Sequence, residues 1–294
     1  MPKGDHTALT GWHVEAHSQG KDPAEPEANE DRLVLRPPWL FAVIDGATDK
    51  TGRRFNGFTG GRIAADVVEA VLLSQPSPLA PGSGVRLVAE INRRLRRRYR
   101  ELGIVQEALA DATARFCASL ALVWRSEVRF CFLLAGDCGL RINGKELIQQ
   151  RTQTEEICIA IRVAVWTHLQ RNEVPLPRCA EMARAYTVQG LGALQPRTRH
   201  HLGAVALRTI RAQVRSTLAS RLPHIAEADR TRLIDGGLLA AQHYRNRRHP
   251  LGFAALDGYR VPAELLLRFE RPEASVRRLE LFSDGYPAVP RGHH

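Results

Sequence analysis

The chain has 294 residues, of which 44% are hydrophobic and 25% are charged. These proportions are typical of a globular protein, and they exclude a disordered or collagen-like chain. A chain of this length can form one large domain or two small ones, and it can bury most of its apolar surface without disulfides.

Basic residues outnumber acidic ones by 42 to 31, which gives a formal charge of +11, and only four of the basic residues are lysines. The densest group of arginines lies at 93–100, where apolar residues recur at helical spacing. We interpret this segment as a helix with one buried face and one solvated, arginine-rich face. A partner such as nucleic acid or another anionic polymer is the alternative, although no aromatic residues alternate with these arginines to stack on bases.

Five cysteines, at positions 117, 131, 138, 158 and 179, form no CxxC pair, and their odd number leaves at least one unpaired. We therefore expect reduced thiols and a cytoplasmic protein. The first residues lack the apolar segment of a signal peptide, and no later run is long enough to span a membrane. The sequence thus predicts no membrane partner.

Short apolar runs and helical stripes alternate along the chain. A helix is predicted from Gly60-Gly61 to the loop at 76–84, the arginine-rich helix follows at 86–101, and further helices are predicted between about 153 and 245. Asn143-Gly144 predicts a hairpin with a type I′ turn. The predicted strands are 32–35, 40–44, 118–124, 128–135, 140–142, 146–148, 252–256 and 276–282.

Aspartates lie at the ends of several of these strands. The pattern comprises Asn29-Glu30-Asp31, Asp45-Gly46, Gly136-Asp137 and Ser283-Asp284-Gly285. Each Asp-Gly alone is more often a simple turn. Carboxylates that a sheet gathers together repel one another unless cations neutralise them, and an all-oxygen ligand set suits Mg²⁺ or Mn²⁺ rather than zinc.

The order of these motifs, with GGRIAA opening a helix between FAVIDG and LLAGDCG, resembles the type 2C family of metal-dependent serine/threonine protein phosphatases from about Trp12 to Tyr286. The resemblance implies an α+β fold, a four-layer α-β-β-α sandwich with two stacked antiparallel sheets flanked by helices. It also implies a single phosphatase-like domain over residues 1–294, with the helical region at about 150–245 inside it.

The resemblance also implies roles for the acidic residues. Asp45 would bridge two metal ions, Gly46 would offer its carbonyl oxygen to one, and Asp284 would ligate the other. Asp137 matches the aspartate of a third, weaker metal site. Glu30 and Asp31 match the acidic pair that orients metal-bound water, so that Asp45 and Asp31 are the candidate catalytic residues.

The sequence departs from the family pattern at three places. Asp45-Gly46-Ala47-Thr48-Asp49 replaces the usual DGxGG, and Pro26 stands where many members have a phosphate-binding arginine. Lys21 or Arg32 is the candidate replacement, and the phosphate-binding residue stays unknown. The family's last Asp-Asn ligand lies well beyond the Ser-Asp-Gly motif, and we expect it, with the C-terminal segment that carries it, to be missing.

The resemblance predicts hydrolysis of phosphoserine or phosphothreonine in phosphoprotein substrates by a metal-bridging hydroxide, without a phosphoenzyme. Its cofactors would be two Mn²⁺ or Mg²⁺ ions with a weaker third. The alternative is a pseudophosphatase that keeps the fold as a binding or regulatory module. A nucleotide-binding P-loop at 139–146 is disfavoured, because Glu146 replaces the magnesium-binding Ser/Thr and the segment is predicted to be a hairpin.

Overall fold

The computed structural model describes residues 13–20, 28–47, 53–192 and 198–283. The chain divides into two compact units. One, here called the sheet unit, comprises Met1–Gln150 and Ala254–His294, and the other, the helical unit, comprises Arg151–Phe253. The helical region predicted at about 150–245 therefore forms a unit with its own core, and each unit is described by itself.

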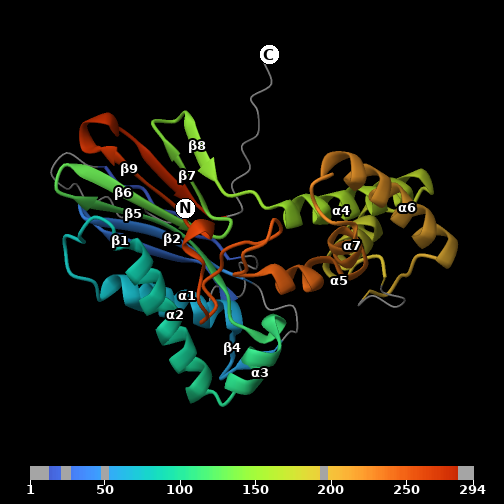
Figure 1. Ribbon diagram of the computed structural model, residues 1–294, viewed down its shortest axis with the longest axis horizontal. Helices are drawn as coiled ribbons and strands as arrows, with labels where there is room; N and C mark the ends of the chain where they lie inside the picture. Colours follow the sequence, from blue (N-terminus) through green and yellow to red (C-terminus); the bar gives the residue numbers. More distant parts are fainter. Residues whose placement is uncertain (1–12, 21–27, 48–52, 193–197, 284–294) are drawn as a thin grey trace. The chain divides into compact units, whose positions relative to one another are not determined.

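The sheet unit contains a five-stranded antiparallel sheet in the order β1-β2-β5-β6-β9 (Figure 1). Its strands are β1 (Arg32–Arg36), β2 (Leu40–Gly46), β5 (Ala118–Ser126), β6 (Arg129–Ala135) and β9 (Leu267–Pro272). The central strands are buried on both faces, since side chains alternate between two separate apolar clusters. Leu120 and Leu122 of β5 face one cluster, and Ala121 and Val123 face the other.

A second antiparallel sheet packs against one face of the first. It has three strands in the order β10-β7-β8, namely β10 (Leu279–Phe282), β7 (Gly139–Ile142) and β8 (Glu146–Gln149). Leu140 and Ile142 of β7 share an apolar cluster with Phe130 and Phe132 of β6. The predicted hairpin turn is confirmed, because Asn143 and Gly144 have φ angles of 54° and 70°.

Helices cover the opposite face of the five-stranded sheet. α1 (Gly60–Leu73) and α2 (Gly84–Glu101) supply apolar side chains to the cluster that contains Leu120 and Leu122. Smaller elements complete the described part of this unit: β3 (Arg54–Phe55), β4 (Phe58–Thr59), α3 (Val105–Ala110) and three-residue 3-10 turns at Ala112–Ala114, Ala263–Leu265 and Glu273–Ser275. The predicted mixture of helices with stacked antiparallel sheets is thus confirmed.

The helical unit is built from α4 (Gln153–Arg171), α5 (Leu176–Gln189), α6 (Ala204–Arg221) and α7 (Glu227–Ala241), followed by a 3-10 turn at Gln242–Tyr244. Buried Ile161, Tyr186, Val214 and Leu233 place one residue from each helix in a common core. Gly237 breaks α7 with a φ of 56°, a conformation that favours glycine.

One predicted strand does not form, one six-residue strand was not predicted, and one predicted strand is shorter than expected. Residues 252–256 form no strand and contribute only two isolated bridges, Ala118 to Leu256 and Arg245 to Phe253. The edge strand β9, Leu267–Pro272, was not predicted, although its burial alternates residue by residue. The strand predicted at 276–282 is shortened to Leu279–Phe282, because the preceding residues follow a 3-10 turn.

All five cysteines are buried and none forms a disulfide. Within the described residues, no helix is both long enough and apolar enough to cross a membrane.

Candidate metal centre

Asp45 and Gly46 are the last two residues of β2, at one end of the five-stranded sheet. The antiparallel register places Asp45 opposite Ser119 and Gly46 opposite Ala118 of β5. β5 continues into the pairing with β6, so that Leu120 lies opposite Ala135, the last residue of β6. The loop after β6, which carries Gly136 and Asp137, therefore lies at the same end of the sheet as Asp45.

Asp137 is held to that end by its neighbours. The hydroxyl of Ser119 donates a hydrogen bond to Asp137 Oδ1 at 2.6 Å, and the amide of Gln149 donates to the Asp137 carbonyl at 2.6 Å. Gly136 turns the chain here with a φ of 90°. A side chain at Gly136 would lie 2.3 Å from Ser119 Oγ, so this turn requires glycine.

A buried thiol shows how three of the predicted acids are grouped. Burial raises the pKa of Cys138 well above its usual range. Three carboxylates raise this pKa further, in decreasing order those of Asp137, Asp45 and Asp31, while a hydrogen bond with the Asp45 backbone acts in the opposite direction. The three carboxylates thus lie within electrostatic range of a single side chain.

Glu30 lies in the segment before β1, and its side chain meets the N-terminus of α1. It is buried, and its Oε1 accepts a hydrogen bond from the hydroxyl of Thr59 at 2.6 Å. Thr59 also caps α1, because its Oγ1 accepts a hydrogen bond from the backbone N–H of Arg62 at 3.2 Å. We call Glu30, Asp31, Asp45 and Asp137 the acidic edge.

Two glycines allow the end of β2 to approach the start of α1. A Cβ atom at Gly46 would lie 2.4 Å from the Gly61 carbonyl oxygen, and one at Gly61 would lie 2.7 Å from Glu30 Oε1. The Gly46 N–H donates to the Glu30 carbonyl at 3.3 Å. Close backbone contact therefore replaces side-chain packing at this point. α1 begins at Gly60, as the Gly60-Gly61 pair predicted.

The side chain of Arg32, a candidate for binding the substrate phosphate, forms hydrogen bonds within the protein. Its Nε donates to Asp66 Oδ1 at 2.7 Å, its Nη1 donates to the Asn29 carbonyl at 3.0 Å, and its side chain is 13% exposed. Arg62 joins the same network through Asp66 and the Asn29 carbonyl. These arginines hold the segment that carries Glu30 and Asp31. Lys21 and Pro26 lie outside the described residues.

The predicted ligand Asp284 also lies outside the described residues, and so do Thr48 and Asp49. Within the described ranges, no group of three His, Cys, Asp or Glu side chains is close enough together to hold a metal ion. Of the predicted ligands, Asp45, Gly46 and Asp137 are described by the structure, and Asp284 is not.

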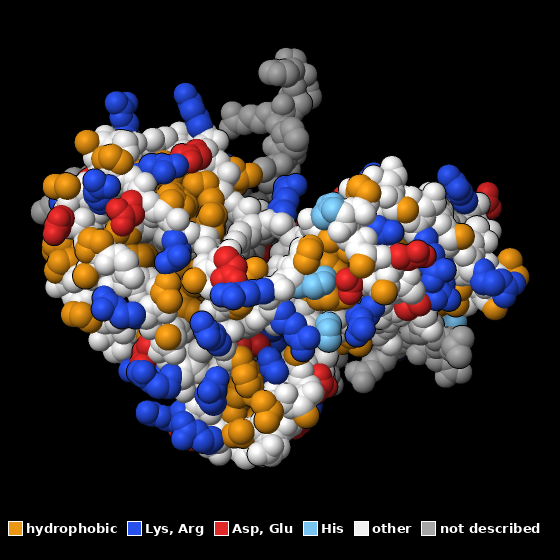
Figure 2. Space-filling model, in the orientation of Figure 1, with side chains coloured by type: hydrophobic (Ala, Val, Ile, Leu, Met, Phe, Trp, Pro, Cys, Tyr) orange, Lys and Arg blue, Asp and Glu red, His pale blue; other side chains and the backbone are white. Residues whose placement is uncertain are grey.

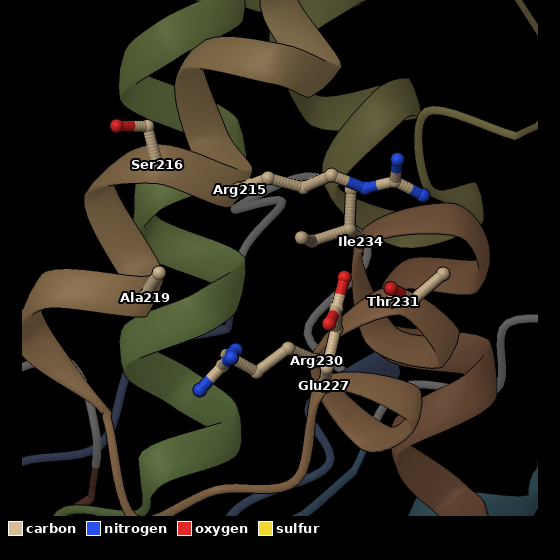
Figure 3. A pocket seen from close by; sticks show the side chains of 7 residues that line it. All are labelled: Arg215, Ser216, Ala219, Glu227, Arg230, Thr231 and Ile234. Carbon is tan, nitrogen blue, oxygen red and sulfur yellow. The ribbon is translucent and has the colours of Figure 1, made fainter.

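Two other places that could hold a ligand contain no residue of the acidic edge. The GxxxxGK match at 139–145 forms β7, a tight turn and the approach to β8, and has no helix for a phosphate to meet. A pocket between α6 and α7 of the helical unit is shown in Figure 3. It is lined by Arg215, Ser216, Ala219, Glu227, Arg230, Thr231 and Ile234.

No protein-family model and no curated protein matches this sequence. Among solved structures, the chain is similar to the Mycobacterium tuberculosis serine/threonine phosphatase PstP/Ppp, with 14% identity, a TM-score of 0.41 and coverage of 96% of this chain and 77% of that one. It is also similar to PppA, a regulatory component of T6SS in Pseudomonas aeruginosa, with 19% identity, a TM-score of 0.31 and coverage of 45% of this chain and 54% of that one.

A structure of PstP in complex with two manganese ions matches with 15% identity, a TM-score of 0.32 and coverage of 61% of this chain and 62% of that one. PstP and PppA are thus each covered over a part of their length, and PppA over about half. The solved structures that match include serine/threonine phosphatases, the kind of enzyme that the sequence motifs resemble.

Proposed function

We propose that this chain is a metal-dependent phosphoprotein phosphatase that hydrolyses phosphoserine and phosphothreonine. The observation that carries the proposal is the position of Asp31, Asp45 and Asp137 at one end of the sheet. Asp31 directly precedes Arg32, which pairs with Ile44, and Ser119, which lies opposite Asp45, donates a hydrogen bond to Asp137. Grouped carboxylates destabilise one another in the absence of a cation, so their concentration at one edge favours a metal-binding role.

The chemistry of the donor groups fits Mn²⁺ or Mg²⁺. Every proposed ligand offers oxygen: the carboxylates of Asp45, Asp137 and Asp284, and the carbonyl of Gly46. The close contact between Gly46 and Gly61 supports the role of Gly46, since any side chain there would displace the backbone whose carbonyl is needed. In this proposal Asp45 would help to hold two ions, Asp284 would help to hold one of them, and Asp137 would help to hold a weaker third.

Two bound ions would supply an activated water nucleophile and would neutralise the charge that develops on the phosphoryl group. The protein's own groups contribute orientation. In this proposal Glu30 and Asp31 would accept hydrogen bonds from the attacking water. The hydroxyl of Thr59, which donates to Glu30 Oε1, would orient the Glu30 carboxylate. Ser119 holds Asp137 in the same way.

The test compares two isosteric variants, Asp45→Asn and Asp137→Asn, in Mn²⁺ titration calorimetry and in hydrolysis of p-nitrophenyl phosphate. Asp45→Asn should abolish hydrolysis and remove the binding of both tighter ions, because it removes the shared carboxylate. Asp137→Asn should weaken a third ion and lower turnover without abolishing it. Unchanged Mn²⁺ stoichiometry and affinity in Asp45→Asn would show that the bridging assignment is wrong.

Melting curves supply an independent readout. Without metal, Asp45→Asn should melt at a higher temperature than the unaltered chain, because one of the repelling charges is gone. Added Mn²⁺ should stabilise only the unaltered chain. Hydrolysis that persists in excess chelator would overturn metal dependence. A chain that binds phosphopeptide without any hydrolysis would instead support the alternative role of a pseudophosphatase that acts as a binding module.

A further inference from the structure

The arginines of helix α2 differ in whether they form contacts within the protein. Arg94 donates to Glu90 at 2.8 Å, Arg98 donates to Glu101 at 2.9 Å, and Arg96 donates to the Gly258 carbonyl at 3.0 Å. These three side chains are therefore occupied within the protein. The buried face of α2, which includes Leu87, Ile91, Leu95 and Tyr99, fixes the rotation of the helix against the sheet.

The remaining arginines of α2 form a single line. Arg86, Arg97 and Arg100 are exposed and have no ion-pair partner among the described residues, while Arg93 shares Glu90 with Arg94. At 100° per residue, Arg86, Arg93, Arg97 and Arg100 lie within about 60° of one another and extend over about 21 Å of the helix. We call these four residues the arginine stripe. Figure 2 shows basic side chains gathered on the surface that α2 forms.

Hydrogen bonds connect the last turn of α2 to the segment that pairs with the end of β2. Tyr99, in the last turn of α2, donates hydrogen bonds to the carbonyls of Phe116 at 3.2 Å and Asp257 at 2.8 Å. The next residue after Phe116 accepts a hydrogen bond from Ala47, which directly follows the Asp45-Gly46 pair. The buried face of the last turn of α2 and the end of β2 are therefore both hydrogen-bonded to the segment at Phe116 and Cys117.

We propose that the arginine stripe binds an acidic segment of the phosphoprotein substrate, so that the preferred substrates carry a run of Asp or Glu beside the phosphorylated residue. This inference rests on the proposed phosphatase function. Arginine suits the role because its planar guanidinium pairs with carboxylates through two hydrogen bonds. Spacings of four and three residues between Arg93, Arg97 and Arg100 bring them onto one side of the helix.

The stripe favours an acidic peptide over nucleic acid. Glu90 lies beside the middle of the stripe and would repel the continuous charge of a phosphate backbone, and no aromatic side chain stands among the four arginines to stack on a base. A peptide, in contrast, can place its acidic residues opposite the unpaired arginines alone.

The experiment uses the full chain and two matched double variants, each of which removes two positive charges from α2. Arg97→Gln/Arg100→Gln removes stripe residues, and Arg94→Gln/Arg98→Gln removes arginines that are paired internally. The probes are a fluorescent phosphoserine peptide followed by a run of glutamates, the same peptide with glutamines, and a DNA duplex. Binding is measured by fluorescence anisotropy at low and high salt, and hydrolysis of the peptides by phosphate release.

The stripe variant should bind the glutamate peptide five- to tenfold more weakly, roughly the scale of two exposed ion pairs, and raise KM rather than lower kcat for it. The control variant should change either quantity less than about twofold, and high salt should reduce the difference. Equal losses in both variants, or equal affinity for the two peptides, would overturn the proposal, as would a stripe-dependent loss of DNA binding alone.

The outcome for the docking surface is separable from the outcome for catalysis. If the unaltered chain hydrolyses no phosphopeptide with Mn²⁺, the proposed function fails. A stripe-dependent loss of affinity for the glutamate peptide would still identify the docking surface in that case.

Discussion

Uncharged residues hold the carboxylates of the acidic edge in place. The hydroxyl of Thr59 connects Glu30 to the N-terminus of α1, and the hydroxyl of Ser119 connects Asp137 to β5. Gly46 and Gly61 permit backbone contacts that any larger residue would break. The geometry of the site therefore depends on small, uncharged residues as well as on the carboxylates themselves.

Thr59 offers a direct test of this dependence. Thr59→Val keeps the branched shape and removes the hydroxyl, so α1 loses its cap and the buried carboxylate of Glu30 loses a donor. We expect the free energy of unfolding to fall by about 2 kcal/mol. Urea denaturation followed by circular dichroism measures this loss, and Mn²⁺ titration should show weaker binding in the same variant.

Thr59→Ser is the control, since it keeps the hydroxyl and loses only a methyl group. Its unfolding free energy should stay within about 0.5 kcal/mol of the unaltered chain. If the serine and valine variants lose equal stability, packing of the methyl group, rather than the hydrogen bonds of the hydroxyl, stabilises this junction.

At the scale of single residues, the sequence predicts the acids as candidate site residues but does not predict the groups that hold them in place. Asp45 and Asp137 stand out because each follows an apolar strand, a pattern visible in one dimension. Ser119 meets Asp137 only through the register of β5 against its neighbours, which no local pattern specifies. Arg32 looked available for phosphate because its partner Asp66 is 34 residues away.

At the scale of elements, the sequence correctly predicted the turns and helices that have strong local sequence patterns. The turn residues Asn143 and Gly144 specify a hairpin, and the apolar stripe of α2 specifies which face is buried. β9 was missed because an edge strand keeps charged residues on alternate positions and has only a short apolar pattern. The apolar run at 252–256 contributes Ala254, Ala255 and Leu256 to the buried interior, yet it pairs with other segments only at isolated bridges.

The helix α4 carries a thiol that makes stability depend on pH. The pKa of Cys158 is raised from its ordinary value of 9.0 to about 12, chiefly by burial; the charge of Arg162 opposes this rise and that of Glu155 adds to it. As pH rises above the unfolded value, the unfolded thiol releases its proton while the folded thiol keeps it. Stability must then fall with rising pH, by about 1.4 kcal/mol from this thiol between about pH 8 and about pH 10.

The variant Cys158→Ala isolates this contribution. It should be less stable than the unaltered chain at neutral pH because of the cavity, but it should lose less stability on going to high pH. Cys131, whose pKa burial raises to about 11, titrates in both chains and cancels in the comparison. Urea denaturation at the two pH values measures the difference, and parallel pH dependences in the two chains would contradict the prediction.

At the scale of the whole molecule, the helical unit is one continuous stretch of chain, whereas the sheet unit is assembled from two separate stretches. The helical unit has its own buried core, to which all four of its helices contribute. The arginine at position 211 pairs with Asp235 across α6 and α7 at 2.6 Å, inside the same unit. From the sequence, this helical region is predicted to lie within a single domain. Helical periodicity shows where helices form, but it does not show which helices share a core.

We therefore predict that residues 151–253 fold when expressed alone. The segment is within the size range of independent domains, and its core residues contact one another rather than needing partners from elsewhere in the sequence. Circular dichroism should show a predominantly helical spectrum and one cooperative thermal transition. Leu233→Asp, which places a charge in the buried core, should abolish the transition, whereas Val163→Asp, at a position that is 57% exposed, should preserve it. A helical spectrum that melts without cooperativity in the unaltered segment would mean that the core forms only within the full chain, as expected for a single domain over residues 1–294.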